Sequence, residues 1–167
     1  MTGYTRAAAA QAIDLLRTLD AGSQQWLNGD IAWLFDLPPE HYERVHAFAP
    51  DAYGVVWRAD RPFIYPDGKA IWRAPNLTGS LDAAHAVAPE GWFLRVEPRF
   101  HSDEGQVTFI SHALKPDWSS WHPNHDAAWI AMCGPIRCAK PAPAILAAAI
   151  AALAHDHGDI IVQGDER

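Results

Sequence analysis

An α+β fold is predicted for this chain: an antiparallel sheet layered between N-terminal helices and a C-terminal helix rich in alanine and leucine, an α-β-α sandwich. Two observations predict it. Apolar residues recur at helical spacing near the two ends of the chain and only briefly between them. In the C-terminal half, three successive β-prone runs have no helical segment between them, which is typical of an antiparallel sheet.

Three helices are expected in the N-terminal part of the chain. The first begins after Thr5, a residue type that caps helix N-termini, and continues to about residue 20. The second begins at Asn28 and ends before a pair of prolines. The third covers residues 38–48, PPEHYERVHAF, because proline suits the first turn of a helix and the apolar residues that follow form a stripe.

The middle of the chain changes from helical to extended patterning. The runs YGVVWRA and PFIYPDGKAIWR are β-prone, and Pro66-Asp67-Gly68 in the second run predicts a hairpin turn. Ser80 is the expected N-cap of a short helix, LDAAHAVA.

Three strands and a final helix complete the prediction. The strands are GWFLRVEPRF, in which Trp92, Leu94 and Val96 share one face, GQVTFISHAL and DAAWIAMCG. The last helix extends from about Pro141 to His155 and has no charged face. We therefore expect it to be covered on more than one side, by the sheet and by the N-terminal helix.

Length and charge limit the classes of function. The 167 residues, 49% of them hydrophobic, predict one domain over residues 1–160, followed by a polar tail over 161–167. The net charge of −7 argues against direct binding of nucleic acid. Gln11 and Asp14 interrupt the apolar start, and no stretch is long enough to cross a bilayer, so we expect a cytoplasmic protein without a membrane partner. In that compartment, Cys133 and Cys138 are not expected to form a disulfide framework.

Two segments resemble a family of small phage and prophage proteins. TGSLDAAHAVAPEGW at 78–92 and PAPAILAAAIAAL at 141–153 are similar to a recurring pattern of this family, and LLRTLDAG and NGDIAWLF resemble its N-terminal part. The family is similar to the phage α-β-α sandwich domain and has no assigned activity. The resemblance implies a phage accessory protein, with interference in a host defence such as CRISPR immunity as one role, and it carries over no catalytic residues. The hairpin around Pro66 and the segment WSSWHPNHDAAW depart from the pattern as insertions.

The second insertion holds the candidate binding residues. Trp118, Trp121, His122 and His125 combine large aromatic side chains with two imidazoles, a composition that anchors protein interfaces. We expect them to contact a partner. The alternatives are that the tryptophans fold back onto the sheet, or that His122, His125 and Asp126 begin a metal site. His155 or His157 would have to complete that metal site.

Other chemistry is less well supported. Ser111-His112 has no acid at triad spacing, and no phosphate-binding glycine motif is present, so no cofactor is expected. Arginines and tryptophans alternate in the strand region, as in proteins that hold nucleic acid, but acidic residues among them favour a charge-balanced sheet face. The arginines are Arg58, Arg61, Arg73, Arg95 and Arg99, and the tryptophans are Trp57, Trp72 and Trp92.

These observations favour a non-enzymatic phage accessory protein that binds a host protein or a ribonucleoprotein complex. The first alternative is a small metal-dependent hydrolase that uses His122, His125 and Asp126. The second is a structural phage component, for which a homo-oligomer and an exposed sheet edge are expected.

Overall fold

The structure is a computed structural model that describes residues 3–19, 25–45, 71–101, 105–117 and 129–161. The helices and strands in chain order are α1 (Arg6–Thr18), α2 (Gln25–Leu34), a 3₁₀ helix (Pro39–His41), β1 (Glu43–Val45), β2 (Ile71–Arg73), α3 (Leu81–Ala86), β3 (Phe93–His101), β4 (Gln106–Pro116), β5 (Trp129–Cys138) and α4 (Pro141–Asp156).

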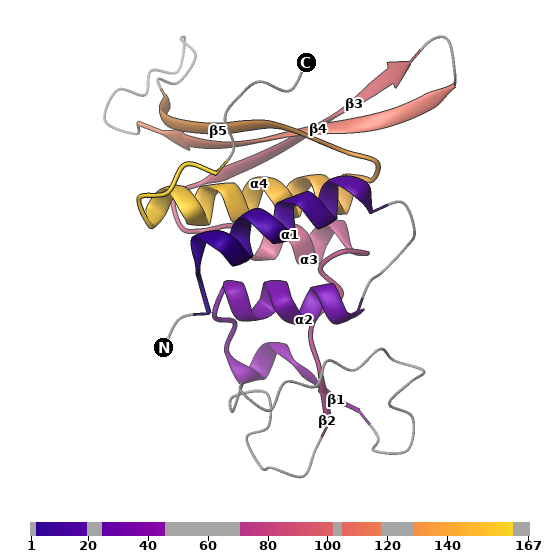
Figure 1. The fold of residues 1–167 in the computed structure, drawn as a ribbon, viewed down its shortest axis with the longest axis vertical. Helices are drawn as coiled ribbons and strands as arrows, with labels where there is room; N and C mark the ends of the chain where they lie inside the picture. Colours follow the sequence, from indigo (N-terminus) through magenta and orange to yellow (C-terminus); the bar gives the residue numbers. More distant parts are fainter. Residues whose placement is uncertain (1–2, 20–24, 46–70, 102–104, 118–128, 162–167) are drawn as a thin grey trace.

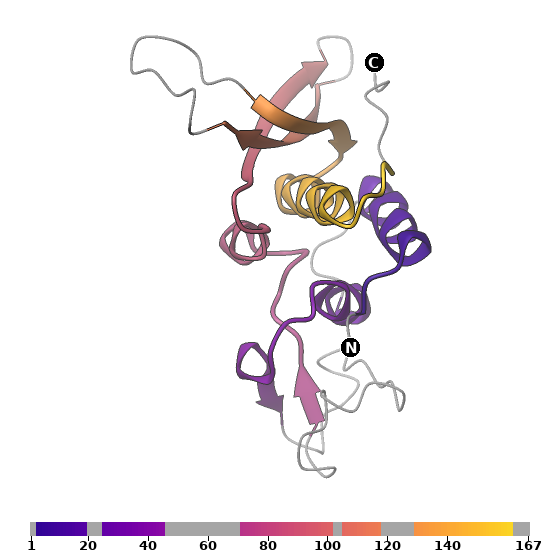
Figure 2. The same cartoon turned by 90° about the vertical axis from the view of Figure 1, so that its left-hand side faces the viewer.

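Helix α4 occupies the centre of the fold. One side of it packs against the antiparallel sheet β3-β4-β5, and another side packs against α1 (Figure 1). Helix α2 lies against α1 on the side away from the sheet, and α3 packs against α4 (Figure 2). The predicted α+β class is confirmed, as is the covering of the last helix by the sheet and the N-terminal helix. The layer order differs from the expected one in that α4, rather than the sheet, lies between the other two layers.

The composition of α4 explains its central position. Pro141 occupies the first turn, where its missing N–H costs no hydrogen bond. Half of the helix is alanine, whose short side chain lets neighbouring elements approach closely, and Ile145, Leu146 and Ile150 fill the remaining space. Every residue from Ala142 to Ala152 is buried. A helix that is apolar on all sides is stable only when it is enclosed on several sides.

The three-stranded sheet has one face toward α4. β3 pairs with β4 from Phe93↔Leu114 to His101↔Gln106, and β4 pairs with β5. Trp92, Leu94 and Val96 belong to the core on the α4 side, as predicted. No described helix packs on the opposite face, which is called the outer face below (Figures 1 and 2).

Side-chain caps and one buried hydrogen bond fix the helices. Thr5 accepts a hydrogen bond from the N–H of Ala8, and Ser80 accepts one from the N–H of Ala83, so both predicted N-caps are confirmed. The buried Asn28 Oδ1 accepts the N–H of Thr78 at 2.8 Å, which ties α2 to the segment that precedes α3.

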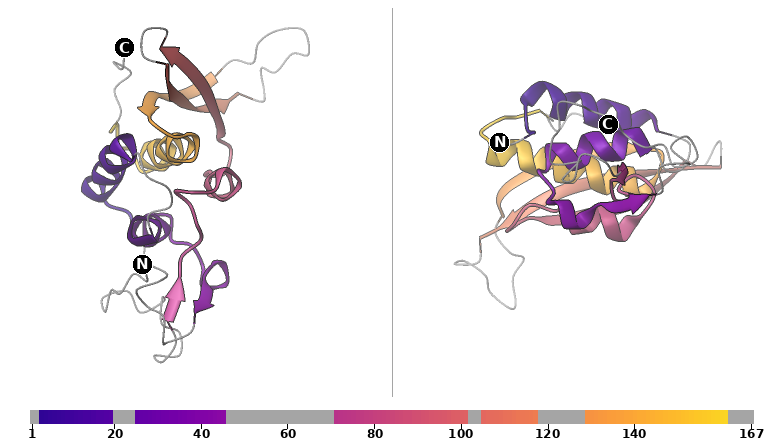
Figure 3. Two further views of the ribbon diagram at one scale, coloured as in Figure 1. Left: turned by 90° about the vertical axis from the view of Figure 1, so that its right-hand side faces the viewer. Right: turned by 90° about the horizontal axis from the view of Figure 1, so that it is seen from below.

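The predicted helix over 38–48 is wrong for residues 38–45, and residues 46–48 lie outside the described part of the chain. Only Pro39–His41 forms a single 3₁₀ turn, and Glu43–Val45 is a strand that pairs with β2 (Figure 3). Cross-strand pairing overrides the local helical pattern here, and the Arg73 guanidinium forms an ion pair with Glu43 on the facing strand. The second helix begins at Gln25, earlier than the expected Asn28.

Several expectations lie outside the described residues. They are the β-prone runs over 53–70 with the turn at Pro66-Asp67-Gly68, and the polar tail from residue 162 onward. Among the helices that the structure describes, none combines the length and the apolar composition needed to cross a bilayer.

Candidate functional site

The predicted binding loop lies outside the described residues. Trp118, Trp121, His122, His125 and Asp126 all belong to the segment 118–128, which follows β4 and precedes β5. Their role in partner binding, and the alternative metal site, therefore stay predictions.

The C-terminal histidines and aspartates have structural partners. The Tyr4 hydroxyl donates a hydrogen bond to Asp159 at 2.5 Å, and the Tyr4 ring stacks on His157 with 3.9 Å between centroids. Burial of the hydroxyl, followed by this hydrogen bond to Asp159, raises the pKa of Tyr4 well above its usual value. His155 contacts the Trp92 ring edge-to-face. In the described ranges, no three histidine, cysteine, aspartate or glutamate side chains gather as a metal would require.

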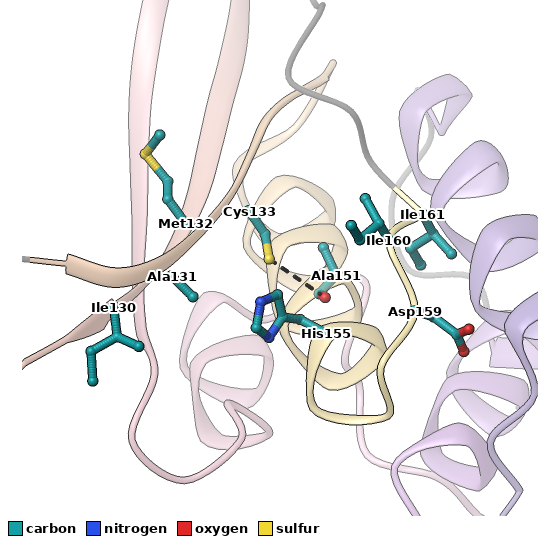
Figure 4. Close-up of a pocket in the computed structure, with 9 residues that line it drawn as sticks. All are labelled: Ile130, Ala131, Met132, Cys133, Ala151, His155, Asp159, Ile160 and Ile161. Atoms are coloured by element: carbon teal, nitrogen blue, oxygen red, sulfur yellow. Dashed lines mark hydrogen bonds between the residues drawn. The ribbon is translucent and has the colours of Figure 1, made fainter.

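A cleft of about 290 Å³ lies between β5 and the C-terminal end of α4 (Figure 4). Cys133 points from β5 toward α4, and its thiol donates a weak hydrogen bond to the carbonyl oxygen of Ala151 at 3.7 Å. Burial, followed by the negative charge of Asp156, raises the pKa of the Cys133 thiol to about 11. A thiol that stays protonated at neutral pH is a poor nucleophile, so this cleft does not have the chemistry of a cysteine-dependent active site.

The two cysteines do not form a disulfide. Cys133 and Cys138 are both free and buried. The segment between them does not form a simple turn, because it remains within β5 and contains a cis Gly134-Pro135 peptide bond. The register shift there places Gly134 and Pro135 opposite His112 on β4.

Ser111 and His112 do not form a catalytic pair. Ser111 is fully buried on the α4 side, where its hydroxyl lies 3.5 Å from the carbonyl oxygen of Ile136. His112 follows it on β4, and successive side chains of a strand point to opposite faces. The hydroxyl and the imidazole are therefore neighbours in the sequence only, and they do not face each other.

The outer face carries an apolar row across the three strands. Phe93, Leu114 and Met132 pair directly with one another from β3 to β4 to β5, so their side chains lie on the same face. Leu114 in the middle is only 8% exposed, whereas Phe93 and Met132 are 59% and 61% exposed. This set of three residues is called the apolar row below. Large exposed apolar side chains that flank a buried one form the kind of patch that marks an interaction surface.

The other end of the outer face is basic. A hollow of about 390 Å³ is lined by Arg99, Phe100, His101, His112, Pro135 and Arg137. Its floor is Ile110, which is only 6% exposed although it faces away from α4. We call this feature the basic hollow.

Charges around the hollow are partly compensated. Arg95 forms an ion pair with Glu97, and Arg99 Nη2 lies 3.7 Å from Glu97 Oε2. The predicted pairing of sheet arginines with acidic neighbours is thus confirmed for Arg95 and Arg99, which both lie close to Glu97. Desolvation, followed by the positive charges of Arg95 and Arg99, lowers the pKa of His112. Glu97 therefore compensates part of the charge that the two arginines of β3 place near His112.

Sequence reasoning missed the hollow as a unit. The sequence analysis names Arg95 and Arg99 but not His101, which follows on the same strand. His112 and Arg137 lie on β4 and β5, far from them in the sequence. The signal for the β3 part was present, because Arg95, Glu97, Arg99 and His101 alternate at the period of two that places side chains on one face.

Comparison of the chain with protein-family models, with curated proteins and with solved structures finds no significant match.

Proposed function

We propose that this chain is a phage- or prophage-encoded accessory protein that acts in the host cytoplasm by binding a host protein or ribonucleoprotein complex, and that it thereby inhibits a defence system such as CRISPR immunity. Two independent supports lead to this proposal. One is the resemblance of residues 78–92 and 141–153 to a phage protein family. The other, which carries the proposal, is the apolar row on the outer face of the sheet.

The energetics of the apolar row favour a binding role. Phe93 and Met132 leave most of their apolar surface in water, although the core on the other face of the same sheet is well covered. Burial of side chains of this size contributes about 1.5–3 kcal/mol each, so a partner that covers both gains a substantial part of its affinity from them. Aromatic anchors beside an already buried residue are typical of the small set that dominates binding energy.

The described chemistry supports binding over catalysis. The buried thiol of Cys133 has a raised pKa, and Ser111 and His112 lie on opposite faces of the sheet. The residues that are exposed on the outer face are suited to contact rather than to nucleophilic attack. The segment that contains Trp118 and Trp121 is proposed to contact the same partner.

The test is protection of a phage in a bacterial host with an active CRISPR system. Wild-type protein is expected to restore plating of the targeted phage and to copurify with the effector complex. The variant Phe93→Ser/Met132→Ser is expected to lose both properties. Leu81→Ser is the matched control, because it removes an exposed apolar side chain from α3, which lies on the helical side of the sheet (Figure 2).

The variants show whether the apolar row or the segment with Trp118 and Trp121 binds the partner. Loss of protection in Trp118→Ala/Trp121→Ala, with Phe93→Ser/Met132→Ser fully active, would assign binding to the loop and overturn the role of the apolar row. A wild-type protein that neither protects the phage nor copurifies with the effector complex would contradict the proposed function. Circular dichroism of every variant checks that the fold is retained.

A further inference from the structure

The two edge strands of the described three-stranded sheet differ in composition. In the order β3-β4-β5, the edges are β3 and β5. β3 carries the charged residues Arg95, Glu97 and Arg99, and it also contains Pro98. Charged residues and proline are usual means by which soluble proteins keep a sheet edge from pairing with another chain. β5 has no charged residue from Trp129 to Ile136, so its edge lacks this protection.

Exposed apolar side chains gather along the same edge. Trp129, Ile130 and Met132 are between 47% and 65% exposed. Ile160, which follows α4, is also exposed, and it lines the same cleft as Ile130 and Met132 (Figure 4). Met132 points away from α4, whereas Ala131 points toward it, so the strand has apolar side chains on both faces (Figure 4). A contiguous exposed group of this kind marks an interaction surface.

The backbone of this part of β5 is suited to pairing with a further strand. Among the described strands, β5 pairs with β4 alone, and an edge strand presents a row of N–H and C=O groups on its other side. The extended stretch ends at Cys133, because Gly134 has a φ of +111° and Pro135 has no N–H to donate. The stretch Trp129–Cys133 is called the β5 edge below.

We propose that the β5 edge pairs antiparallel with the β5 edge of a second copy of this chain, which joins the two sheets into one continuous sheet. An antiparallel pair of identical strands has a two-fold axis, so each protomer contributes the same surface. The pair is centred on the middle residue of the stretch, Ala131. This inference goes beyond the proposed function and does not depend on it.

The composition of the β5 edge suits a second copy as the occupant. Because the edge has no charged residue, pairing it with itself brings no like charges opposite each other, although the net charge of the chain is −7. The small side chain of Ala131 lies at the centre, where the two main chains approach. Asp159 lines the cleft beside the edge, but its carboxylate points away from β5 and accepts the hydrogen bond from Tyr4 (Figure 4).

The exposed apolar surface is sufficient for a weak dimer. Trp129, Ile130, Met132 and Ile160 each leave roughly 100 Å² of side chain in water. Together with the paired main chain, two protomers would bury about 1,000 Å² in total, which is the lower limit for a specific interface. We therefore expect a dissociation constant in the micromolar range.

The dimer also affects the apolar row. The two-fold axis of an antiparallel strand pair is perpendicular to the sheet, so the outer faces of both protomers lie on the same side of the continuous sheet. Met132 of each protomer is then close to the axis. The dimer thus presents two apolar rows in one direction and offers a partner a larger apolar surface than one chain does.

Sedimentation velocity of the full chain, at concentrations from about 1 to about 100 μM, measures the association. Wild-type protein is expected to shift with concentration from the 18.4 kDa of one chain toward twice that mass. Ile130→Lys places a charge on the β5 edge and should raise the dissociation constant at least about tenfold. Phe100→Lys is the matched control, because it adds the same charge at an exposed apolar residue of the other edge strand. The control should leave the dissociation constant unchanged.

Disulfide crosslinking tests the register of the pair. In an antiparallel pair centred on Ala131, the Cα atoms of this residue in the two protomers lie about 4.5–5.5 Å apart, a separation that a disulfide spans. Ala131→Cys is therefore expected to form a crosslinked dimer on oxidation. Wild-type protein, whose two cysteines are buried, and Leu81→Cys on α3 should not. Circular dichroism of every variant checks that the fold is retained.

Three results would overturn the inference. They are a wild-type protein that stays monomeric at about 100 μM, equal weakening of the dimer by Ile130→Lys and Phe100→Lys, and a wild-type dimer without a crosslink from Ala131→Cys. A monomer would leave the β5 edge to a different occupant, such as a segment of the host partner. A monomer that protects the phage would refute the dimer while the proposed function stands. A dimer that gives no protection would refute the proposed function instead.

Discussion

The indole N–H of Trp92 donates a hydrogen bond to the carboxylate of Asp156, 3.1 Å from each of its oxygens. This contact joins the start of β3 to the C-terminal end of α4, which are 64 residues apart in the chain. Lys115 on β4 lies 3.6 Å from the same carboxylate and 5.6 Å from the centre of the Trp92 ring. Trp92 points to the helical side and Phe93 is exposed on the other, so the contact also fixes the position of the apolar row.

Replacement of Asp156 by alanine is expected to destabilise the protein by about 1.5 kcal/mol. A hydrogen bond to a charged group contributes about 1.5–3 kcal/mol, and removal of a negative charge from a helix C-terminus returns about 0.3–1 kcal/mol. Denaturant unfolding measures the difference. In a Trp92→Phe background, which lacks the N–H donor, the same replacement should cost much less. Equal costs in both backgrounds would show that the two residues are not coupled.

Replacement of Gly134 by alanine is expected to cost about 3 kcal/mol or more. Gly134 has a φ of +111°, and an added Cβ would lie 2.7 Å from the carbonyl oxygen of Ser111. Gly158→Ala is the matched control, because its φ is +81° but no atom lies within 4 Å of the added Cβ. The control should lower the free energy of unfolding by only about 1 kcal/mol, because its added Cβ meets no atom and only the cost of the left-handed backbone conformation remains. Thermal unfolding that ranks the two variants in the reverse order would contradict the steric account.

The pKa of His112 is expected to lie below its ordinary value of 6.5 and to rise when Arg95 is replaced by glutamine. Burial is the largest cause of the low pKa and remains in this variant, so the rise should be partial. An NMR titration of the imidazole ring measures it. Arg73→Gln serves as the control and should leave the titration of His112 unchanged. An unchanged pKa of His112 in Arg95→Gln would show that the Arg95 guanidinium does not contribute to the lowering of that pKa.

The same shift has a consequence for stability. A histidine with a lower pKa in the folded state takes up its proton more readily in the unfolded state. The contribution of His112 to the free energy of unfolding is therefore intact above about pH 6.5 and is lost as the pH falls through the folded-state pKa. Denaturant unfolding at several pH values measures this contribution. As the pH falls below about 6.5, the free energy of unfolding should decrease less steeply in His112→Gln than in the wild type.

The sequence predicts most of the described fold because its local signals agree with its tertiary contacts. Thr5 and Ser80 are strong N-caps, and the apolar faces of β3 and α4 have the periods of a strand and a buried helix. The prediction of a helix over 38–48 is wrong because Glu43–Val45 pairs with Ile71–Arg73 instead. This pairing joins residues that are far apart in the sequence, so the local helical pattern gives no sign of it. The apolar composition of α4 on all sides, by contrast, predicts its covering by the sheet and by α1.

The candidate site is less predictable because it combines three strands. Alternation places Arg95, Glu97 and Arg99 on one face, but whether that face is covered by a helix is a property of the whole fold. The cross-strand register that brings Phe93, Leu114 and Met132 into one row also cannot be read from any one of these strands.

The most direct test of the account is photo-crosslinking from the apolar row inside the host cell. A photoreactive phenylalanine analogue at position 93 or 132 is expected to crosslink to a component of the defence complex that the wild-type protein inhibits, and the same analogue at Leu81 is not. Crosslinks to that component from Leu81 alone, or none from positions 93 and 132 in cells where the phage is protected, would contradict the claim that the outer face of the sheet binds the host partner.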